Sequence, residues 1–273
     1  MKTKSGLQLG ISLPQNFPEE RLDLGTLRTY IRRAEELGFD DGWLTENILS
    51  ENFQLEPVTY LSYLAALTQR IRLGVAIVIL NTRNPVQLAK ALASLDQLSN
   101  GRFTLGVGIG TGTKNYAAFG IPEERRVARF EEAIRVMKAL WTQESATVAG
   151  DFWKIEEARM LPKPIQKPHI PIVFGGHAEA ALRRAVRLGD GWMAAGSIST
   201  EQSIDSLKQI RGLLKEAGRD ESKFMLSKRL YIAIDDDEAK ARARLSEALA
   251  YMYGAQDCRS MGVAGAPGRI VEV

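Results

Sequence analysis

The fold class that the sequence predicts is α/β, in the form of a barrel of parallel strands that are each followed by a helix. Short β-type runs alternate with longer helical patterns from residue 7 onward, which is typical of parallel strands joined by helices. The chain of 273 residues suits one such barrel, because α/β barrels often occupy roughly 200 to 250 residues as a single domain. We therefore expect a single barrel domain over residues 1–273.

Seven β-type runs are predicted to be the parallel strands of this barrel. They are Leu7–Leu13, Gly42–Thr45, Ile71–Leu80, Phe103–Ile109, Pro171–Phe174, Gly191–Ala195 and Phe224–Ile234. Between them the helices repeat apolar residues with the α-helical period, as do Leu24, Leu27, Tyr30, Ile31 and Ala34. Two helices are each expected to end at a left-handed glycine, Gly38 or Gly189, directly before a strand.

The end of the chain departs from a complete (β/α)8 TIM barrel. An eighth strand and helix should follow the helix predicted at Ala239–Tyr253, but the chain stops at Val273. Residues 269–273 have the pattern of the start of a helix. We therefore predict an eightfold barrel whose last βα unit is missing from this chain.

One segment, from about residue 143 to residue 169, breaks the alternation of strands and helices. It contains Gly150, Phe152, Trp153 and three prolines in place of a simple turn. Long loops inside a compact domain are often lids or binding loops, and a proline-rich surface segment is the ordinary alternative. We expect this excursion to pass over one end of the barrel.

Composition and charge argue against several classes of protein. The 36 Lys and Arg residues are interspersed with 33 Asp and Glu residues, so no basic surface for nucleic acid is expected. The longest apolar run, Val75–Leu80, is far too short to span a membrane, and no signal peptide is recognisable. The single Cys258 suits a reducing compartment, and the two histidines lack the spacing of a zinc site. We predict a cytoplasmic protein without a metal centre that acts on a small molecule, as a monomer or a homodimer.

Active sites of α/β barrels lie at the C-terminal ends of the strands, so the residues that follow each predicted strand are the candidates for binding and catalysis. After the fifth predicted strand, Gly175-Gly176-His177-Ala178 leads into a helix. Paired glycines let a ligand approach the backbone closely, and the free N–H groups of a helix start attract phosphate, which the ring of His177 could also reach. A tight turn that needs glycine only for its shape is the alternative, and we weigh the two interpretations equally.

The fourth predicted strand carries glycine at every second position, and it continues into Thr111. Alternation puts Gly106, Gly108 and Gly110 on one face of the strand, which is therefore bare. A flat ring or a phosphate could lie against this face, or the bare face could reflect close packing inside the barrel. A dinucleotide-binding fingerprint is excluded, because no acidic residue ends a strand about 20 residues later.

Polar residues also follow the second and third predicted strands. Glu46 and Asn47 place a carboxylate and an amide at the mouth of the barrel, although a lone Glu at a strand end is more commonly solvated or caps a helix. Asn81 and Arg83 follow the third strand and are well placed to meet a ligand. A turn and a helix cap would explain Asn84, which precedes a proline in the first turn of the next helix.

Three longer stretches together resemble the luciferase-like family of flavin- or deazaflavin-dependent oxidoreductases, and the resemblance spans most of the chain. The stretches are residues 73–86, 92–108, and 171–176 continuing through 188–192. The resemblance implies a TIM barrel of the luciferase-like type, with the cofactor ring at its mouth and a cis peptide between Ala76 and Ile77 next to the ring. The cofactor-binding residues that it implies, together with those singled out above, are Ala76, Ile77, Asn81, Gly108, Gly110, Thr111, Gly175, Gly176, His177 and Ala178.

The sequence departs from this family at Asn47, where many members have a histidine that is used in proton transfer. An asparagine cannot be a general base. Either Glu46 or a substrate group handles protons, or the reaction is a hydride transfer that needs no base, or activity has been lost. The catalytic candidates are therefore Glu46 and Asn47.

The leading hypothesis is an oxidoreductase that transfers a hydride, or activates oxygen, through bound coenzyme F420 or FMN. Its substrate would be a small organic molecule that the excursion covers, and the overall pattern leans slightly toward F420. One alternative is a flavin-binding protein without turnover. Another is a TIM-barrel enzyme that acts on a phosphorylated metabolite without redox chemistry, which would need a catalytic acid or base that the sequence does not reveal.

Overall fold

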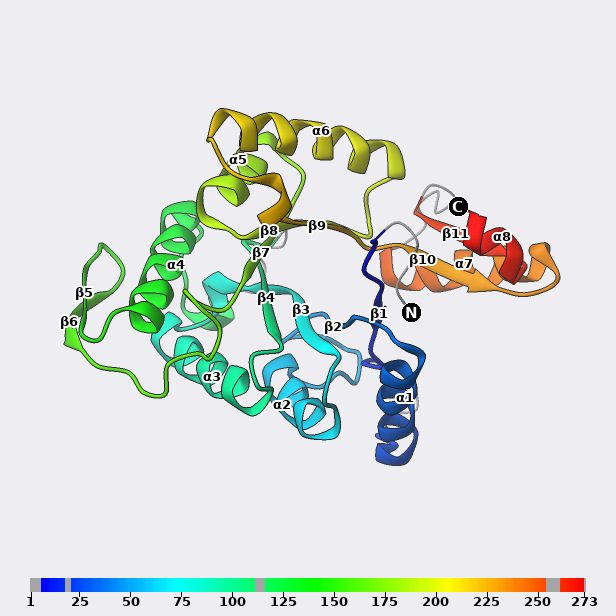
Figure 1. The fold of residues 1–273 in the computed structure, drawn as a ribbon, viewed down its shortest axis with the longest axis horizontal. Coiled ribbons are helices and arrows are strands. Elements are labelled where there is room, and N and C mark those ends of the chain that lie inside the picture. Colours follow the sequence, from blue (N-terminus) through cyan, green and yellow to red (C-terminus); the bar gives the residue numbers. More distant parts are fainter. Residues whose placement is uncertain (1–5, 18–20, 111–115, 254–260, 273) are drawn as a thin grey trace. The chain divides into compact units, whose positions relative to one another are not determined.

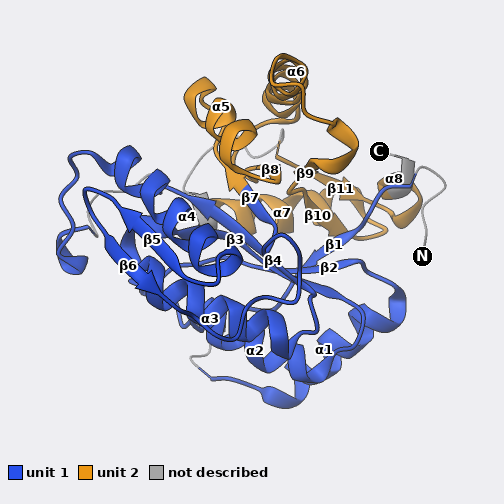
Figure 2. Ribbon diagram, turned by 60° about the vertical axis from the view of Figure 1, so that its left-hand side comes forward, with its two compact units in different colours: residues 1–173 blue, residues 174–273 orange. Residues whose placement is uncertain are grey.

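The computed structural model describes residues 6–17, 21–110, 116–253 and 261–272 (Figure 1). The chain forms two compact units, residues 1–173 and residues 174–273, which Figure 2 distinguishes by colour. The predicted single domain over the whole chain stays a prediction.

The first unit is built from parallel strands joined by helices, as the sequence predicts. Its strands β1, β2, β3 and β4 are hydrogen-bonded neighbours in this order, and every pair is parallel. The elements in chain order are β1 (Gly10–Ser12), α1 (Leu24–Leu37), β2 (Asp41–Leu44), α2 (Pro57–Leu67), β3 (Arg72–Ile79), η1 (Leu80–Thr82), α3 (Pro85–Leu98), β4 (Phe103–Gly108), η2 (Ala117–Phe119) and α4 (Arg126–Thr142). All residues of β4 are buried, which places this strand in the core of the sheet.

Helix boundaries in this unit follow from local capping. The carboxylate of Asp23 accepts hydrogen bonds from the N–H groups of Gly25 and Thr26 at the start of α1, and Asn84 caps α3 in the same way. Gly38 ends α1 with φ of 85°, a conformation that favours glycine.

The matching prediction for Gly189 is wrong. This residue ends α5 (Glu179–Leu188) in an extended conformation, with φ of −103°. A Cβ atom at Gly189 would overlap the ring of Phe174, so glycine is required there by close packing and not by a left-handed turn.

The excursion contains an antiparallel hairpin that the sequence analysis does not identify, formed by β5 (Ala146–Ala149) and β6 (Lys154–Ala158). The segment after it runs along α3, since the carboxylate of Asp96 accepts hydrogen bonds from the N–H groups of Ile165 (2.7 Å) and Gln166 (3.1 Å). Asp96 is fully buried, so this contact fastens the segment to the first unit.

The second unit continues the alternation of strands and helices. The strand β7 crosses the boundary between the units, β8 pairs in parallel with β9, and β10 pairs in parallel with β11. The elements are β7 (Ile172–Gly175), α5, β8 (Gly191–Ala194), α6 (Thr200–Glu216), η3 (Glu221–Lys223), β9 (Met225–Lys228), β10 (Tyr231–Ile234), α7 (Glu238–Tyr253), β11 (Gly262–Gly265) and α8 (Pro267–Glu272).

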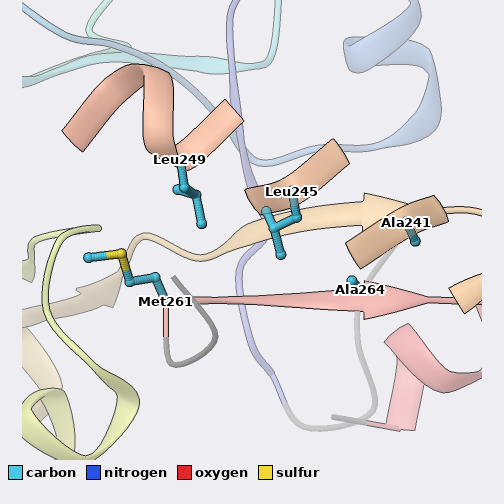
Figure 3. Packing of buried hydrophobic residues seen from close by; sticks show 5 residues of the cluster. All are labelled: Ala241, Leu245, Leu249, Met261 and Ala264. Atoms are coloured by element: carbon cyan, nitrogen blue, oxygen red, sulfur yellow. The ribbon is translucent and has the colours of Figure 1, made fainter. Parts of the chain in front are cut away.

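Two features of this unit differ from the sequence analysis. The run predicted as one strand, Phe224–Ile234, is divided into β9 and β10, because its two halves pair with different partners. After α7 the chain forms β11, to which the sequence analysis assigns no strand. Figure 3 shows the small core of this region, in which α7 packs on β11 and β10; its residues are Ala241, Leu245, Leu249, Met261 and Ala264.

Candidate functional site

The carboxylate of Glu46, two residues after β2, is buried and is held directly by Ile79 at the end of β3 and by Arg83. Its side chain has 0% exposure, against 22% for that of Arg83. One oxygen accepts a hydrogen bond from the N–H of Ile79 (2.8 Å), and the other accepts from Nε (3.0 Å) and Nη2 of Arg83. The same Nη2 also donates to Glu56 (2.8 Å), whose second oxygen caps α2 through the N–H of Thr59 (2.7 Å). Glu46 is therefore a buried ion-pair partner and neither solvated nor a helix cap.

Burial raises the pKa of Glu46, and the positive charge of Arg83 and the Ile79 N–H oppose that rise without cancelling it. Burial also disfavours the charge of Arg83, but the carboxylates of Glu46 and Glu56 outweigh it and hold the pKa of Arg83 above its usual value. The carboxylate of Glu46 is therefore easier to protonate than an exposed one, whereas its partner Arg83 holds its proton more firmly.

Asn47, the second catalytic candidate, is exposed and lies at the start of a loop with exposed apolar residues. Ile48, Leu49 and Phe53 are 39%, 50% and 39% exposed, and Phe53 packs edge-to-face on Phe17. Asn47 is therefore followed by a loop that exposes these apolar side chains together with the polar residues Ser50, Glu51 and Asn52.

The peptide bond between Ala76 and Ile77 is cis, as the resemblance implies. Both residues are partly exposed, whereas Val75 and Val78 on either side of them are buried. The pairing register of β3 with β4 also shifts between Val75 and Val78. Part of an otherwise buried strand is thus accessible at the position expected for the cofactor ring.

The bare face of β4 is filled by β3. A Cβ atom at Gly108 would overlap the side chain of Ile77, and one at Gly106 would overlap the carbonyl oxygen of Val75. Close packing between strands, one of the two interpretations that the sequence left open, therefore accounts for these glycines. A contact of Gly108 or of Gly110 with a phosphate stays a prediction.

Asn81 is fully buried and links the ends of two strands to α4. Its Nδ2 donates hydrogen bonds to the hydroxyl of Tyr116 (3.2 Å) and to the carbonyl of Arg126 (3.0 Å), and that hydroxyl donates to the carbonyl of Ile109 (2.6 Å). Its Oδ1 is a buried acceptor without a partner among the described residues. The amide nitrogen of Asn81 is thus engaged within the protein.

The Gly175–Ala178 segment leads from β7 into α5, and Ala178 is the N-cap residue of that helix. Gly176 has φ of 106°, which only glycine adopts readily, and its carbonyl accepts a hydrogen bond from the indole of Trp192 (2.7 Å). His177 and Ala178 are exposed, and the N-cap residue Ala178 provides no side-chain hydrogen bond to the first turn. The N–H groups of this turn therefore lack a side-chain cap and fit an anion such as a phosphate.

The candidate residues divide between the units. Glu46, Asn47, Ala76, Ile77, Asn81, Gly108 and Gly110 belong to the first, and Gly175, Gly176, His177 and Ala178 to the second. Thr111 lies outside the described residues. Sequence reasoning missed Glu56 and Tyr116; Glu56 precedes a proline, which is a recognisable signal for a helix start, whereas nothing in the sequence marks Tyr116.

Within the described ranges, no group of three or more His, Cys, Asp or Glu side chains could hold a metal ion. Among the helices that the structure describes, none is long and apolar enough to cross a membrane.

Parallel strands that alternate with helices define the chain as an α/β fold. The chain belongs to the luciferase-like monooxygenase family, whose sequence profile matches residues 7–268. The predicted family and the predicted α/β fold class of the luciferase-like type are therefore confirmed.

Relatives within this family differ in the cofactor that they use. The chain is 30% identical over 231 residues to an F420-dependent glucose-6-phosphate dehydrogenase of Kineococcus radiotolerans, covering 81% of this chain and 68% of that protein. It is 31% identical over 201 residues to an FMNH2-dependent dimethylsulfone monooxygenase of Pseudomonas putida, covering 72% and 54%. The family thus includes F420-dependent and FMNH2-dependent enzymes.

One further relative and one solved structure are also similar to the chain. An uncharacterized protein of Mycobacterium tuberculosis is 38% identical over 170 residues, covering 61% of this chain and 58% of that protein, so the chain spans under two thirds of this relative. The crystal structure of the monooxygenase RslO1 of Streptomyces bottropensis superposes with a TM-score of 0.81 at 29% identity, covering 97% of this chain and 86% of that one.

Proposed function

We propose that this chain is an oxidoreductase that uses bound F420 or FMN to act on a small organic substrate. The observation that carries the proposal is the start of α5, where Gly176 and a first turn without a side-chain cap suit the phosphate that both cofactors possess. Family membership over residues 7–268 supplies the class of chemistry.

In this proposal Gly175, Gly176, His177 and Ala178 hold the phosphate, and Ala76 and Ile77 lie against the ring. The cofactor, when bound, supplies the electron transfer, and the protein contributes binding, orientation and exclusion of water. One group works against the phosphate: Glu179 puts a carboxylate in the first turn of α5. Its ion pair with Arg183 (2.8 Å) offsets that charge.

Glu46 is proposed as a positioning residue instead of a general base. One oxygen of Glu46 accepts a hydrogen bond from the N–H of Ile79 and the other accepts from Arg83. Glu46 therefore fixes the backbone at the end of β3, close in sequence to Ala76 and Ile77. Asn47 is the exposed candidate for contact with the reacting groups, and its amide can orient a substrate but cannot take its proton. This arrangement favours hydride transfer over a step that needs a base at position 47.

F420 is the first cofactor to test, because the F420-dependent relative covers more of this chain, 81%, than the FMNH2-dependent one, 72%. A cytoplasmic location, a homodimer and cover of the substrate by the excursion are further parts of the proposal.

The test is titration of the purified protein with F420 and, separately, with FMN, followed by visible absorbance and fluorescence. We expect one of them to bind, and we expect Gly176→Asp to weaken its binding at least about tenfold, because a carboxylate at a helix start repels phosphate. Gly176→Asn is the matched control, because it introduces a side chain of the same size at the same positive φ but without the charge. Binding of neither cofactor, or equal affinity of parent and Gly176→Asp, would contradict the proposal.

A second candidate is a cofactor-binding protein without turnover. It is favoured by one observation: the carboxylate of Glu46 is engaged in an ion pair and Asn47 cannot accept a proton, so neither catalytic candidate offers a free base. Tight cofactor binding without turnover of any substrate offered would support this candidate over the first.

A further inference from the structure

A buried carboxylate outside the candidate site holds the tip of the β5–β6 hairpin. Glu132, in the second turn of α4, is 3% exposed. It accepts hydrogen bonds from three successive backbone N–H groups, those of Asp151 (3.0 Å), Phe152 (2.9 Å) and Trp153 (2.8 Å). A Cβ atom at Gly150 would overlap the same carboxylate. The turn is therefore shaped around Glu132, and its three amides depend on one anionic acceptor.

Two arginines complete this contact, Arg129 in α4 and Arg125, the N-cap residue of that helix. The guanidinium of Arg129 lies over the rings of Trp153 (4.6 Å to the centroid) and Phe152 (5.5 Å), and that of Arg125 lies over Phe152 (5.1 Å) and pairs with Asp151. The Nε of Arg129 is buried without a hydrogen-bond partner in the described part of the chain, so stacking on the rings is its principal contact.

The same turns of α4 are joined to the candidate cofactor residues. The carbonyl of Arg126, the first residue of α4, accepts a hydrogen bond from Asn81 at the end of β3. Asn81 also contacts Tyr116, whose hydroxyl holds the carbonyl of Ile109, between Gly108 and Gly110. A continuous series of contacts within the first unit thus connects the hairpin tip with the ends of β3 and β4.

We propose that Glu132 is a positioning residue for the cofactor site. By fixing the hairpin tip on α4 it also fixes the start of this helix, and through Asn81 and Tyr116 it sets the backbone around Ile109. Replacement of the carboxylate by an amide leaves one acceptor oxygen and sets an NH2 donor against at least one of the three backbone N–H groups, so the tip and the helix start loosen together. The inference rests on the proposed function for its effect on the cofactor, but not for its effect on the backbone.

The experiment compares the full chain with Glu132→Gln, which keeps the size of the side chain but removes its charge. Amide hydrogen exchange measured by mass spectrometry should accelerate at residues 151–153 and also at residues 109 and 110. The affinity for F420 or FMN, whichever the parent binds, should fall by about 2- to 30-fold. Glu144→Gln is the control, because the side chain of Glu144 is 87% exposed and its ion pair with Arg159 is long, at 3.6 Å.

A second variant guards against a trivial effect of folding. Gly150→Ala leaves Glu132 in place but forces the turn away from it, so it should reproduce both changes. Faster exchange confined to residues 151–153, with the exchange at residues 109 and 110 equal to that of the parent in both variants, would overturn the inference. A parent that binds neither cofactor would defeat the proposed function, while the exchange at residues 109 and 110 would still decide the role of Glu132.

Discussion

Replacement of Arg83 by methionine should destabilise the protein strongly, because it removes the cation from a buried ion pair. The carboxylate of Glu46, with no exposed surface, would keep only the N–H of Ile79 as a partner. Breaking a buried pair by removing one partner typically costs about 3 to 5 kcal/mol. The contact with Glu56, whose side chain is 34% exposed, adds less than about 1 kcal/mol.

The loss should depend on pH in a defined direction. Burial already raises the pKa of Glu46 in the folded protein, and removal of Arg83 takes away the charge that opposes this rise. When folding raises the pKa of a carboxyl group, the contribution of that group lowers the free energy of unfolding as the pH increases. The decrease runs from the pKa of the group in the unfolded chain, about 4.3, through its pKa in the folded protein. The deficit of Arg83→Met should therefore be smaller at pH 5, where Glu46 can take up a proton, than at pH 8.

Thermal unfolding followed by circular dichroism at both pH values measures this effect. A loss of about 3 kcal/mol should lower Tm by about 10 °C at pH 8, given a shift of about 2 to 4 °C per kcal/mol for chains of this size. Arg33→Met is the matched control, because its pair with Glu36 is 64% exposed on both sides and should contribute under about 1 kcal/mol. Glu46→Gln combined with Arg83→Met should recover part of the loss. Equal losses at pH 5 and pH 8, without recovery in the double variant, would refute the reasoning.

Two further predictions concern packing and chemistry. Gly74→Ala should lower the free energy of unfolding in urea by about 1 to 3 kcal/mol, because its Cβ would overlap the ring of Trp43. The control Gly212→Ala in α6 should be neutral or stabilising. An unchanged stability of Gly74→Ala would mean that Trp43 does not pack against residue 74. Asn47→His should leave stability within about 0.5 kcal/mol of the parent, because the site is exposed, and it should raise turnover if proton transfer limits the rate. If the parent is active and Asn47→His has the same turnover, proton transfer at residue 47 does not limit the reaction.

Local patterns were enough to predict the class of fold and most of its elements. Apolar periodicity located α1 and α4, β-type runs located β2, β3 and β4, and the proline and asparagine before α3 marked where that helix begins. These features depend on backbone preferences and capping, which involve residues that are close in sequence. The resemblance to the luciferase-like family added the position of the cis bond between Ala76 and Ile77, which no local pattern indicates.

The partners of the candidate residues depended on contacts between distant segments. Glu46 meets Ile79 and Arg83, which are 33 and 37 residues further along the chain, and Glu132 meets amides 19 to 21 residues away. The pattern of glycines in the fourth strand allowed either a bound ring or phosphate or close packing inside the barrel, and the side chain of Ile77 against Gly108 favours close packing. By itself the sequence determined the fold class, the family and the positions at which chemistry is expected. Only the tertiary structure decided that Glu46 is engaged in an ion pair, because the partner of a buried charge is chosen by which strands and helices pack together and not by its neighbours in sequence.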